Sequence, residues 1–241
     1  MYCGIQACQR FNPKTKNWDK LDNMGTRRRG GSLSKIVEDG KEILLMTGGT
    51  NGTGSTSAIT EDFQIFKDWK WKTKSSSLSL YNHCQAGKWI FGGINEEGDK
   101  SNAVYKLDDD YNWVWYSNLT NPRSNCGATK TISGWGSTEY YYVVGGGADK
   151  SIEQFYTYDN NFYKNDYYIA KLPDELNGHA LYFISPFQYN GTLHIFTRYG
   201  NIFKLHEEWS DPYWEKVKFQ DEGLNLNHKI LIIKQNHIFG P

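Results

Sequence analysis

The stretch Tyr140-Tyr141-Tyr142-Val143-Val144-Gly145-Gly146-Gly147 joins a strand-sized apolar run to a cluster of glycines. The same pattern occurs earlier in the chain, at residues 43–49 and 88–93. Weaker copies end at Gly200 and Gly240, so successive copies lie 40 to 54 residues apart. Self-similarity at such a period indicates a repeat architecture, in which each copy is one small structural unit.

A second signal follows the glycine pairs, namely an aromatic residue and then a Trp with turn formers between them. The clearest copy runs from Phe11 to Trp18, and another runs from Tyr105 to Trp113. Asn, Asp, Pro and Gly at the intervening positions predict two strands joined by a tight turn. No stretch shows a convincing helical period. Each repeat is therefore expected to form four short strands, and radial packing of the copies would bury both faces of each sheet.

Together these features resemble the kelch repeat, whose propeller blades carry a glycine pair, then a Tyr, then a Trp about a turn later. Residues 6–29 are close to that pattern, including Met24 and the arginines that follow it. The resemblance implies an all-β, kelch-like β-propeller with four-stranded blades, formed by residues 1–241 as a single domain.

The two ends of the chain favour a ring of five blades closed by a composite blade. Residues 2–20 are expected to supply its two outer strands, and residues 226–241 its two inner strands. The other blades are expected at residues 27–74, 79–117, 123–172 and 179–218. The alternative is a fragment of a six- or seven-bladed ring, since kelch propellers more often have that many blades.

Composition excludes several classes of protein. The 241 residues carry 27 Lys and Arg against 27 Asp and Glu, a net charge of zero that argues against a nucleic-acid binder. Aromatic residues make up 16% of the chain, so we expect a packed core. The longest apolar runs are strand-sized, which predicts no membrane span. The N-terminus lacks the layout of a signal peptide, so the expected location is the cytoplasm, or the exterior if the N-terminus is incomplete.

The four cysteines are Cys3, Cys8, Cys84 and Cys126, and they form no CxxC pair. Two disulfides are possible, but a chain of this length has enough core to fold without them, so we expect buried free thiols. Three N-glycosylation patterns begin at Asn51, Asn118 and Asn190, about as many as chance predicts.

Candidate binding residues lie where the chain enters each innermost strand. The loops there are rich in Gly, Ser, Asn and charge, as exposed binding loops tend to be; the alternative is that they serve only as connectors. An Arg at this point suits a carboxylate or phosphate ligand; alternatively it caps strand ends by pairing with neighbouring carboxylates or carbonyls. The preferred partner-binding residues are Arg28, Tyr81, His83, Arg123, His179 and His228.

The histidines raise a different hypothesis. His83, His179 and His228 occupy comparable points of three repeats, and converging imidazoles could hold Zn, Cu or Fe. Cys84 and Cys126 are close in sequence to such a site and could add a thiolate. Local metal motifs such as HxH and HExxH are absent from the sequence, which disfavours this hypothesis.

The function predicted from the sequence is protein interaction or scaffolding through one loop face of a monomeric propeller. No catalytic residue and no cofactor are assigned, because GxSxG, Walker and GxGxxG motifs are absent. One alternative is a metal-dependent enzyme that uses His83, His179 and His228, which are expected at the mouth of the propeller's central channel. Another is a secreted glycan-binding or adhesion propeller, which paired cysteines or glycans would favour.

Overall fold

The computed structural model describes residues 2–3, 6–12, 14–51, 58–132, 138–147, 150–158, 161–165, 171–176, 184–189, 191–197, 200–206 and 212–217. Over these residues the regular structure is entirely β-strand, as the sequence predicts. Within the same residues no helix is long and apolar enough to cross a bilayer. The strands form four four-stranded sheets, one three-stranded sheet and a two-stranded ribbon.

Each larger sheet is an antiparallel meander, because strands that neighbour one another in the sheet follow one another along it. We number the sheets I to V in chain order: sheet I holds β1 (Tyr2–Cys3), β2 (Cys8–Asn12) and β3 (Asn17–Lys20); sheet II holds β4 (Ser32–Glu38), β5 (Lys41–Thr47), β8 (Asp62–Lys67) and β9 (Lys70–Ser75); sheet III holds β10 (Cys84–Ala86), β11 (Trp89–Phe91), β12 (Ala103–Leu107) and β13 (Trp113–Asn118); sheet IV holds β14 (Gly127–Ile132), β15 (Glu139–Val144), β16 (Ile152–Tyr158) and β17 (Asn161–Asn165); sheet V holds β18 (Ser185–Tyr189), β19 (Thr192–Phe196), β20 (Ile202–His206) and β21 (Tyr213–Val217). The ribbon of β6 (Thr50–Asn51) and β7 (Ala58–Ile59) extends from sheet II between its second and third strands.

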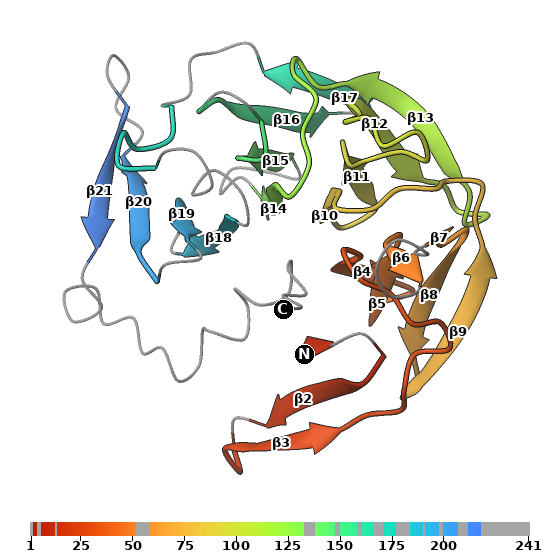
Figure 1. Cartoon of the computed structure of the whole chain (residues 1–241). Coiled ribbons are helices and arrows are strands. Elements are labelled where there is room, and N and C mark those ends of the chain that lie inside the picture. The colour runs from red at the N-terminus through yellow and green to blue at the C-terminus, as the bar shows by residue number, and fades with distance from the viewer. Residues whose placement is uncertain are drawn as a thin grey trace.

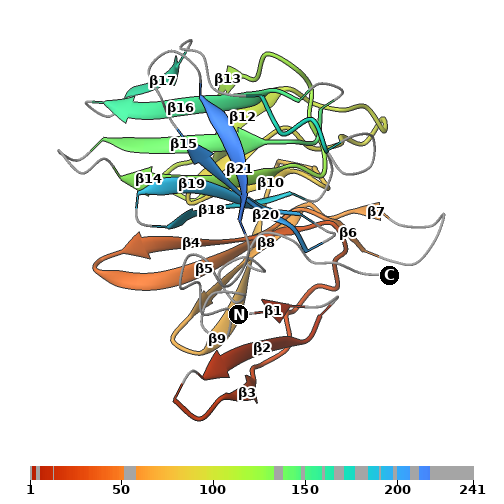
Figure 2. The same ribbon diagram turned by 90° about the vertical axis from the view of Figure 1, so that its left-hand side faces the viewer.

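Sheets II to V lie around a common centre, each with its first strand innermost and its fourth strand outermost (Figure 1). The first strands touch in chain order, β4 against β10, β10 against β14, and β14 against β18. Sheet I lies beyond sheet II at the end of this row in both views (Figures 1 and 2). The arrangement is consistent with a β-propeller-like fold.

The N-terminal sheet differs from the expectation. Residues 2–20 were expected to give two strands, but they form three, because Tyr2 and Cys3 pair with Gln9 and Cys8 ahead of the hairpin of β2 and β3. The strands expected at residues 226–241 lie outside the described residues.

A separate hydrophobic core fills each gap between neighbouring sheets, between I and II, II and III, III and IV, and IV and V. Strand β15 shows how one sequence serves two cores. Tyr141 and Val143 pack into the core shared with sheet III, whereas Tyr142 and Val144 pack into the core shared with sheet V. This follows from the alternation of side chains along a strand, and it explains why the run is continuously apolar.

The glycine pairs lie where one sheet meets the next. Gly48 and Gly92 have positive φ angles of 54° and 61°. A Cβ on Gly48 would lie 2.2 Å from the carbonyl oxygen of Leu80, and one on Gly92 would lie 2.4 Å from that of Arg123. No other residue fits both the conformation and the close approach.

The expectation of free thiols is wrong. Cys84, at the start of β10, and Cys126, just before β14, form a disulfide that joins sheets III and IV, with Cα atoms 5.5 Å apart. That separation is ordinary for a disulfide. Cys8 is disulfide-bonded as well. Cysteines about one repeat apart in sequence become neighbours because the innermost strands of successive sheets touch, a contact that composition and spacing alone did not reveal.

Candidate functional site

The sheets have two chemically different ends. At the loop end lie the glycine pairs and the connections from one sheet to the next, with the sequence-predicted residues Arg28, Tyr81, His83 and Arg123. At the turn end lie the tight turns that join first strands to second strands, such as Gly87-Lys88.

Arg28 is completely buried at the loop end of sheet II. Its Nη1 donates to the carbonyl oxygens of Gly48 (2.9 Å) and Asp62 (3.2 Å), and its Nη2 donates to Oδ1 of Asp62 (2.7 Å). Burial lowers the pKa of Arg28, and the negative charge of Asp62 opposes that effect. Because Gly48 follows β5 and Asp62 begins β8, the guanidinium ties two strand ends to the loop that enters the sheet.

Arg123 repeats this arrangement in sheet IV and is also completely buried. Its Nη1 donates to the carbonyl oxygens of Gly145 (3.0 Å) and Ser151 (3.1 Å). Its Nη2 and Nε donate to Oε1 of Glu153 at 3.0 and 3.1 Å. Burial raises the pKa of Glu153, but hydrogen bonding by the Thr120 backbone N–H and the nearby positive charges outweigh it and leave that pKa below its ordinary value.

The structure therefore corrects the view of Arg28 and Arg123 as contacts for a partner. Neither side chain has exposed surface, and both cap strand ends, the alternative that the sequence left open. The strand registers show which residues of sheet III occupy the equivalent positions. Leu80 corresponds to Arg28 of sheet II, and Ala103 corresponds to Asp62. The cation and its carboxylate are thus replaced together by apolar residues, as expected for a pair that serves the fold.

Tyr81 is half-buried, and its backbone forms an antiparallel bridge with Ile94 (2.8 and 3.1 Å). His83 is buried, and its Nε2 lies 2.8 Å from Oγ1 of Thr47. Thr47 Oγ1 donates to Gln85 (2.6 Å), so we assign the proton to Nε2 of His83. Burial, and secondarily the charge of Arg28, lowers the pKa of His83 to about 3, so the imidazole is neutral near pH 7.

The residues proposed as metal ligands at the loop end are engaged in other contacts. The sulfurs of Cys84 and Cys126 are bonded to each other and supply no thiolate. The Nε2 of His83 is engaged by Thr47 inside the protein. Across the described ranges no group of three His, Cys, Asp or Glu side chains is close enough to hold a metal ion. His179 and His228 lie outside the described residues.

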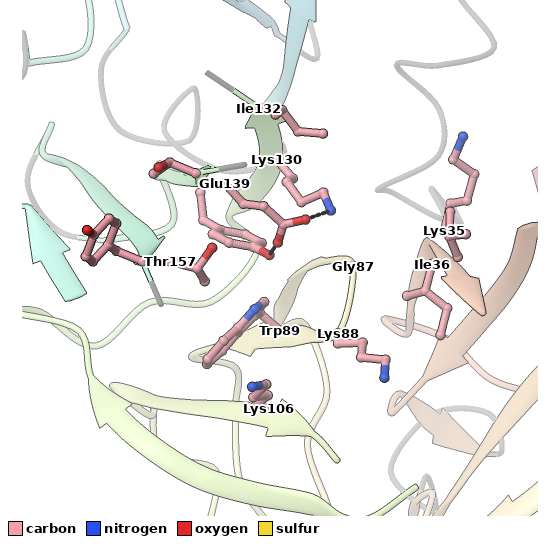
Figure 3. Close-up of a pocket in the computed structure, with 14 residues that line it drawn as sticks. Lys35, Ile36, Gly87, Lys88, Trp89, Lys106, Lys130, Ile132, Glu139 and Thr157 are labelled. Carbon is pink, nitrogen blue, oxygen red and sulfur yellow. Dashed lines mark hydrogen bonds and ion pairs between the residues drawn. The ribbon is translucent and has the colours of Figure 1, made fainter. Parts of the chain in front are cut away.

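The turn end contains a cavity of about 990 Å³ between sheets II, III and IV (Figure 3). It exists because the first hairpin of sheet III is short. Strands β10 and β11 have three residues each, whereas β4 and β5 have seven and β14 and β15 have six. The β10–β11 hairpin therefore turns at Gly87, whereas the β4–β5 and β14–β15 hairpins on either side extend further. These two longer hairpins form the walls of the cavity.

The two walls carry equivalent residues. On sheet II, Lys35 Nζ lies 2.6 Å from Oε1 of Glu42; on sheet IV, Lys130 Nζ lies 2.5 Å from Oε1 of Glu139. Lys35 is the fourth residue of β4 and Lys130 the fourth of β14. The strand registers place the two pairs at the same points of their repeats.

Each wall also exposes an aliphatic side chain beyond its lysine. Val37 pairs with Glu42 across its hairpin, as Ile132 pairs with Glu139. Val37 is 62% exposed and Ile132 60% exposed.

Lys130 and Ile132 lie on the same face of β14 as Ala128, which packs toward sheet III. On β4 the residue that packs toward sheet III is Ile36. Lys35 and Val37 border the cavity from the face of β4 that also carries Leu33 and packs toward sheet I.

The base of the cavity combines buried aromatic residues with another cation. Lys106 Nζ lies 5.4 Å from the centre of the buried Trp89 ring. The hydroxyl of Tyr141 donates to Oε2 of Glu139. Burial raises the pKa of Glu139, but the hydrogen bonds from Lys130 and Tyr141 outweigh it and lower that pKa overall. Burial and then the Glu139 contact raise the pKa of Tyr141.

This arrangement suits binding and not proton transfer. Glu139 stays ionised and both its oxygens are engaged, and Tyr141 stays neutral, so neither is poised near neutral pH as a general acid or base. Ammonium groups above aromatic and aliphatic surface suit an anionic ligand with apolar parts.

Sequence reasoning missed this cavity, although a signal for it exists. Gly48 follows Ser32 by 16 residues, whereas Gly92 follows Cys84 by eight, so the short hairpin can be read from the chain. The cavity itself could not be predicted, because it forms only where sheets II, III and IV come together around that short hairpin.

No family model matches the chain, and no curated protein matches it. The kelch resemblance therefore stays a prediction drawn from the repeats.

Proposed function

We propose that the chain is a non-catalytic binding module that holds an acidic, partly apolar segment of a partner protein in the turn-end cavity. The observation that carries the proposal is the cavity wall of sheet IV, where Lys130 and Ile132 point toward sheet III, across from Ile36 of sheet II. The truncated hairpin of sheet III leaves between them the space that a neighbouring hairpin would otherwise fill.

Spacing favours an extended peptide. Residues two apart on a strand lie about 7 Å from each other on one face, and an extended peptide repeats its side chains at the same interval. A segment in which acidic and apolar residues occur at that interval can therefore match Lys130 and Ile132. Sugar binding is less favoured, because Glu139, the one carboxylate among the described lining residues, is already engaged by Lys130 and Tyr141.

The proposed ring is a kelch-like propeller of five blades, with sheet I completed by a later segment of the chain. Phe187 and Ile202 support this ring, because they are buried in a cluster of sheet V separate from the core shared with sheet IV. Sheet I has one strand fewer than sheets II to V, which leaves a place for such a segment.

The proposed location is an oxidising compartment outside the cytosol. The pair Cys84–Cys126 and the bonded Cys8 favour it, because disulfides persist mainly in secreted proteins and in the secretory pathway. This choice takes the secreted alternative of the sequence in place of the cytoplasmic expectation.

The test is a fluorescence-anisotropy titration of the oxidised protein with a labelled octapeptide of alternating Glu and Tyr. We expect saturable binding that weakens about tenfold when Lys106→Met removes the cation above Trp89, equivalent to about 1.4 kcal/mol. Lys74→Met is the matched control, because Lys74 lies 5.2 Å above the Tyr111 ring and is not among the cavity's lining residues.

Three results would count against the proposal. They are absence of binding, equal weakening by both lysine variants, and equal binding of an octapeptide of alternating Lys and Tyr. A sulfated octasaccharide that binds in the cavity while the acidic peptide does not would replace the proposed partner with a glycan.

A further inference from the structure

We propose that Asn118 is an N-glycosylation site whose sugar covers the exposed outer edge of sheet III. The acceptor pattern is Asn118-Leu119-Thr120, and both Asn118 and Thr120 are exposed. Asn118 is the last residue of β13, the outermost strand of its sheet, so its side chain is accessible to a modifying enzyme. The inference rests on the oxidising compartment of the proposed function, but not on the ligand of the cavity.

The local geometry presents the correct atom. Nε1 of Trp115 donates to Oδ1 of Asn118 at 3.4 Å. An oligosaccharide is transferred from a lipid-pyrophosphate donor: the bond from its C1 to the phosphate oxygen breaks, a bond from C1 to Nδ2 of Asn118 forms, the lipid pyrophosphate leaves and Nδ2 loses one proton. The Oδ1 contact with Trp115 can persist after this modification. It holds the Trp115 ring close to the first sugar, and that ring is 58% exposed.

The outer edge of sheet III carries exposed apolar side chains on β13. Val114 is 49% exposed and neighbours the exposed Trp115 on β13. An edge strand with exposed apolar side chains is a template for pairing with another chain, and proteins usually cover or charge such edges. A glycan at Asn118 would shield this edge, with the indole face as the apolar surface for the sugar ring.

The three acceptor patterns are not equivalent. Asn51 is exposed at the end of β6, but the Thr of its pattern lies outside the described residues, as does Asn190 itself. Asn118 is therefore the one for which the described structure shows an exposed Asn, an exposed hydroxyl residue and an aromatic neighbour together.

The test expresses the full chain behind a secretion signal in eukaryotic cells and maps its tryptic peptides. Peptide-N-glycosidase in H₂¹⁸O replaces the glycosylated amide by a carboxylate, and we expect this mass tag on the peptide of residues 107–123. Asn118→Gln should remove one glycan from the intact mass. Enzymatic removal of the glycan should increase aggregation, measured as light scattering on incubation. Trp115→Ala should diminish that increase, because it removes the exposed indole of the edge strand.

An untagged 107–123 peptide from secreted, disulfide-bonded protein would overturn the proposal, and so would scattering that the glycan does not change. Free cysteines in the secreted protein would instead overturn the compartment. Failure of the acidic octapeptide to bind, with Asn118 modified, would overturn the cavity's proposed ligand and leave this inference standing.

Discussion

The loop end and the turn end of the sheets both gather positive charge, yet they use it in opposite ways. Arg28 and Arg123 have fully buried side chains, and strand-end carbonyl and carboxylate oxygens accept hydrogen bonds from their terminal nitrogens. The side chains of Lys35 and Lys130 are 47% and 37% exposed beside a cavity. A buried cation held by carbonyls and a carboxylate is part of the fold, whereas a half-exposed lysine beside a cavity can also donate to a ligand. The type of charge in the sequence did not distinguish the two; its surroundings do.

The largest expected effect is at the loop end. Arg123→Met should reduce the free energy of unfolding by about 3 kcal/mol, because the buried Glu153 keeps only Lys164 as a counter-charge and the carbonyl oxygens of Gly145 and Ser151 lose their donor. Urea denaturation measures the change. Arg10→Met is the control, since the Arg10–Asp19 pair is exposed and its loss should cost about 1 kcal/mol or less. Equal losses in the two variants would contradict the distinction.

Loss of the Cys84–Cys126 disulfide should reduce stability by a similar amount. Cys84 and Cys126 lie 42 residues apart, and closing a loop of that size stabilises by about 4 kcal/mol in the chain-entropy account, with measured values often smaller. The Cys84→Ala/Cys126→Ala variant should therefore lose up to that amount in urea denaturation. Unchanged stability on reduction of the wild type by dithiothreitol would show that the bond does not form in solution.

Sheet III suggests a double-mutant cycle on sheet II. Arg28→Leu with Asp62→Ala reproduces the pair Leu80 and Ala103. The double variant should lose less stability than the sum of the single variants, with an interaction of about 1–3 kcal/mol. Strict additivity in denaturation would mean that the buried pair is not a unit.

Acid should weaken the loop end through His83. Its pKa is about 3 in the folded protein and about 6.5 when unfolded. Below pH 6.5 His83 binds a proton in the unfolded chain but stays neutral in the folded protein. The contribution of His83 to the free energy of unfolding is therefore complete above pH 6.5 and is lost as the pH falls toward 3. The loss should reach about 2 kcal/mol by pH 5, and His83→Gln should remove that part of the slope.

The turn-end lysines should matter least to stability. The variant Lys35→Met/Lys130→Met should change the free energy of unfolding by less than about 1 kcal/mol, since both ion pairs are partly exposed. A larger loss would place these lysines in the fold, like the buried arginines.

Much of the architecture could be predicted from local patterns. The apolar run of β15 and the glycine pairs at Gly48 and Gly92 each demand a specific local conformation, so the sequence indicates sheets packed on both faces. The role of Arg28 could only be stated as a choice between binding and capping. That choice depends on whether Asp62, 34 residues away, reaches it inside the protein.

Other features depend on contacts between repeats, which one sequence does not specify. The bond between Cys84 and Cys126 requires β10 and β14 to be neighbours. The cavity requires two long hairpins on either side of a short one, so its walls at Lys35 and Lys130 become visible only once sheets II, III and IV are placed together.

The most direct test of the contrast between the two ends is the titration of the Glu–Tyr octapeptide into the Lys35→Met/Lys130→Met variant. The account predicts at least a tenfold weaker affinity than wild type, in a protein that unfolds at nearly the same urea concentration. Unchanged affinity in that folded variant would contradict it, because the exposed cations of the turn end would then have no part in binding.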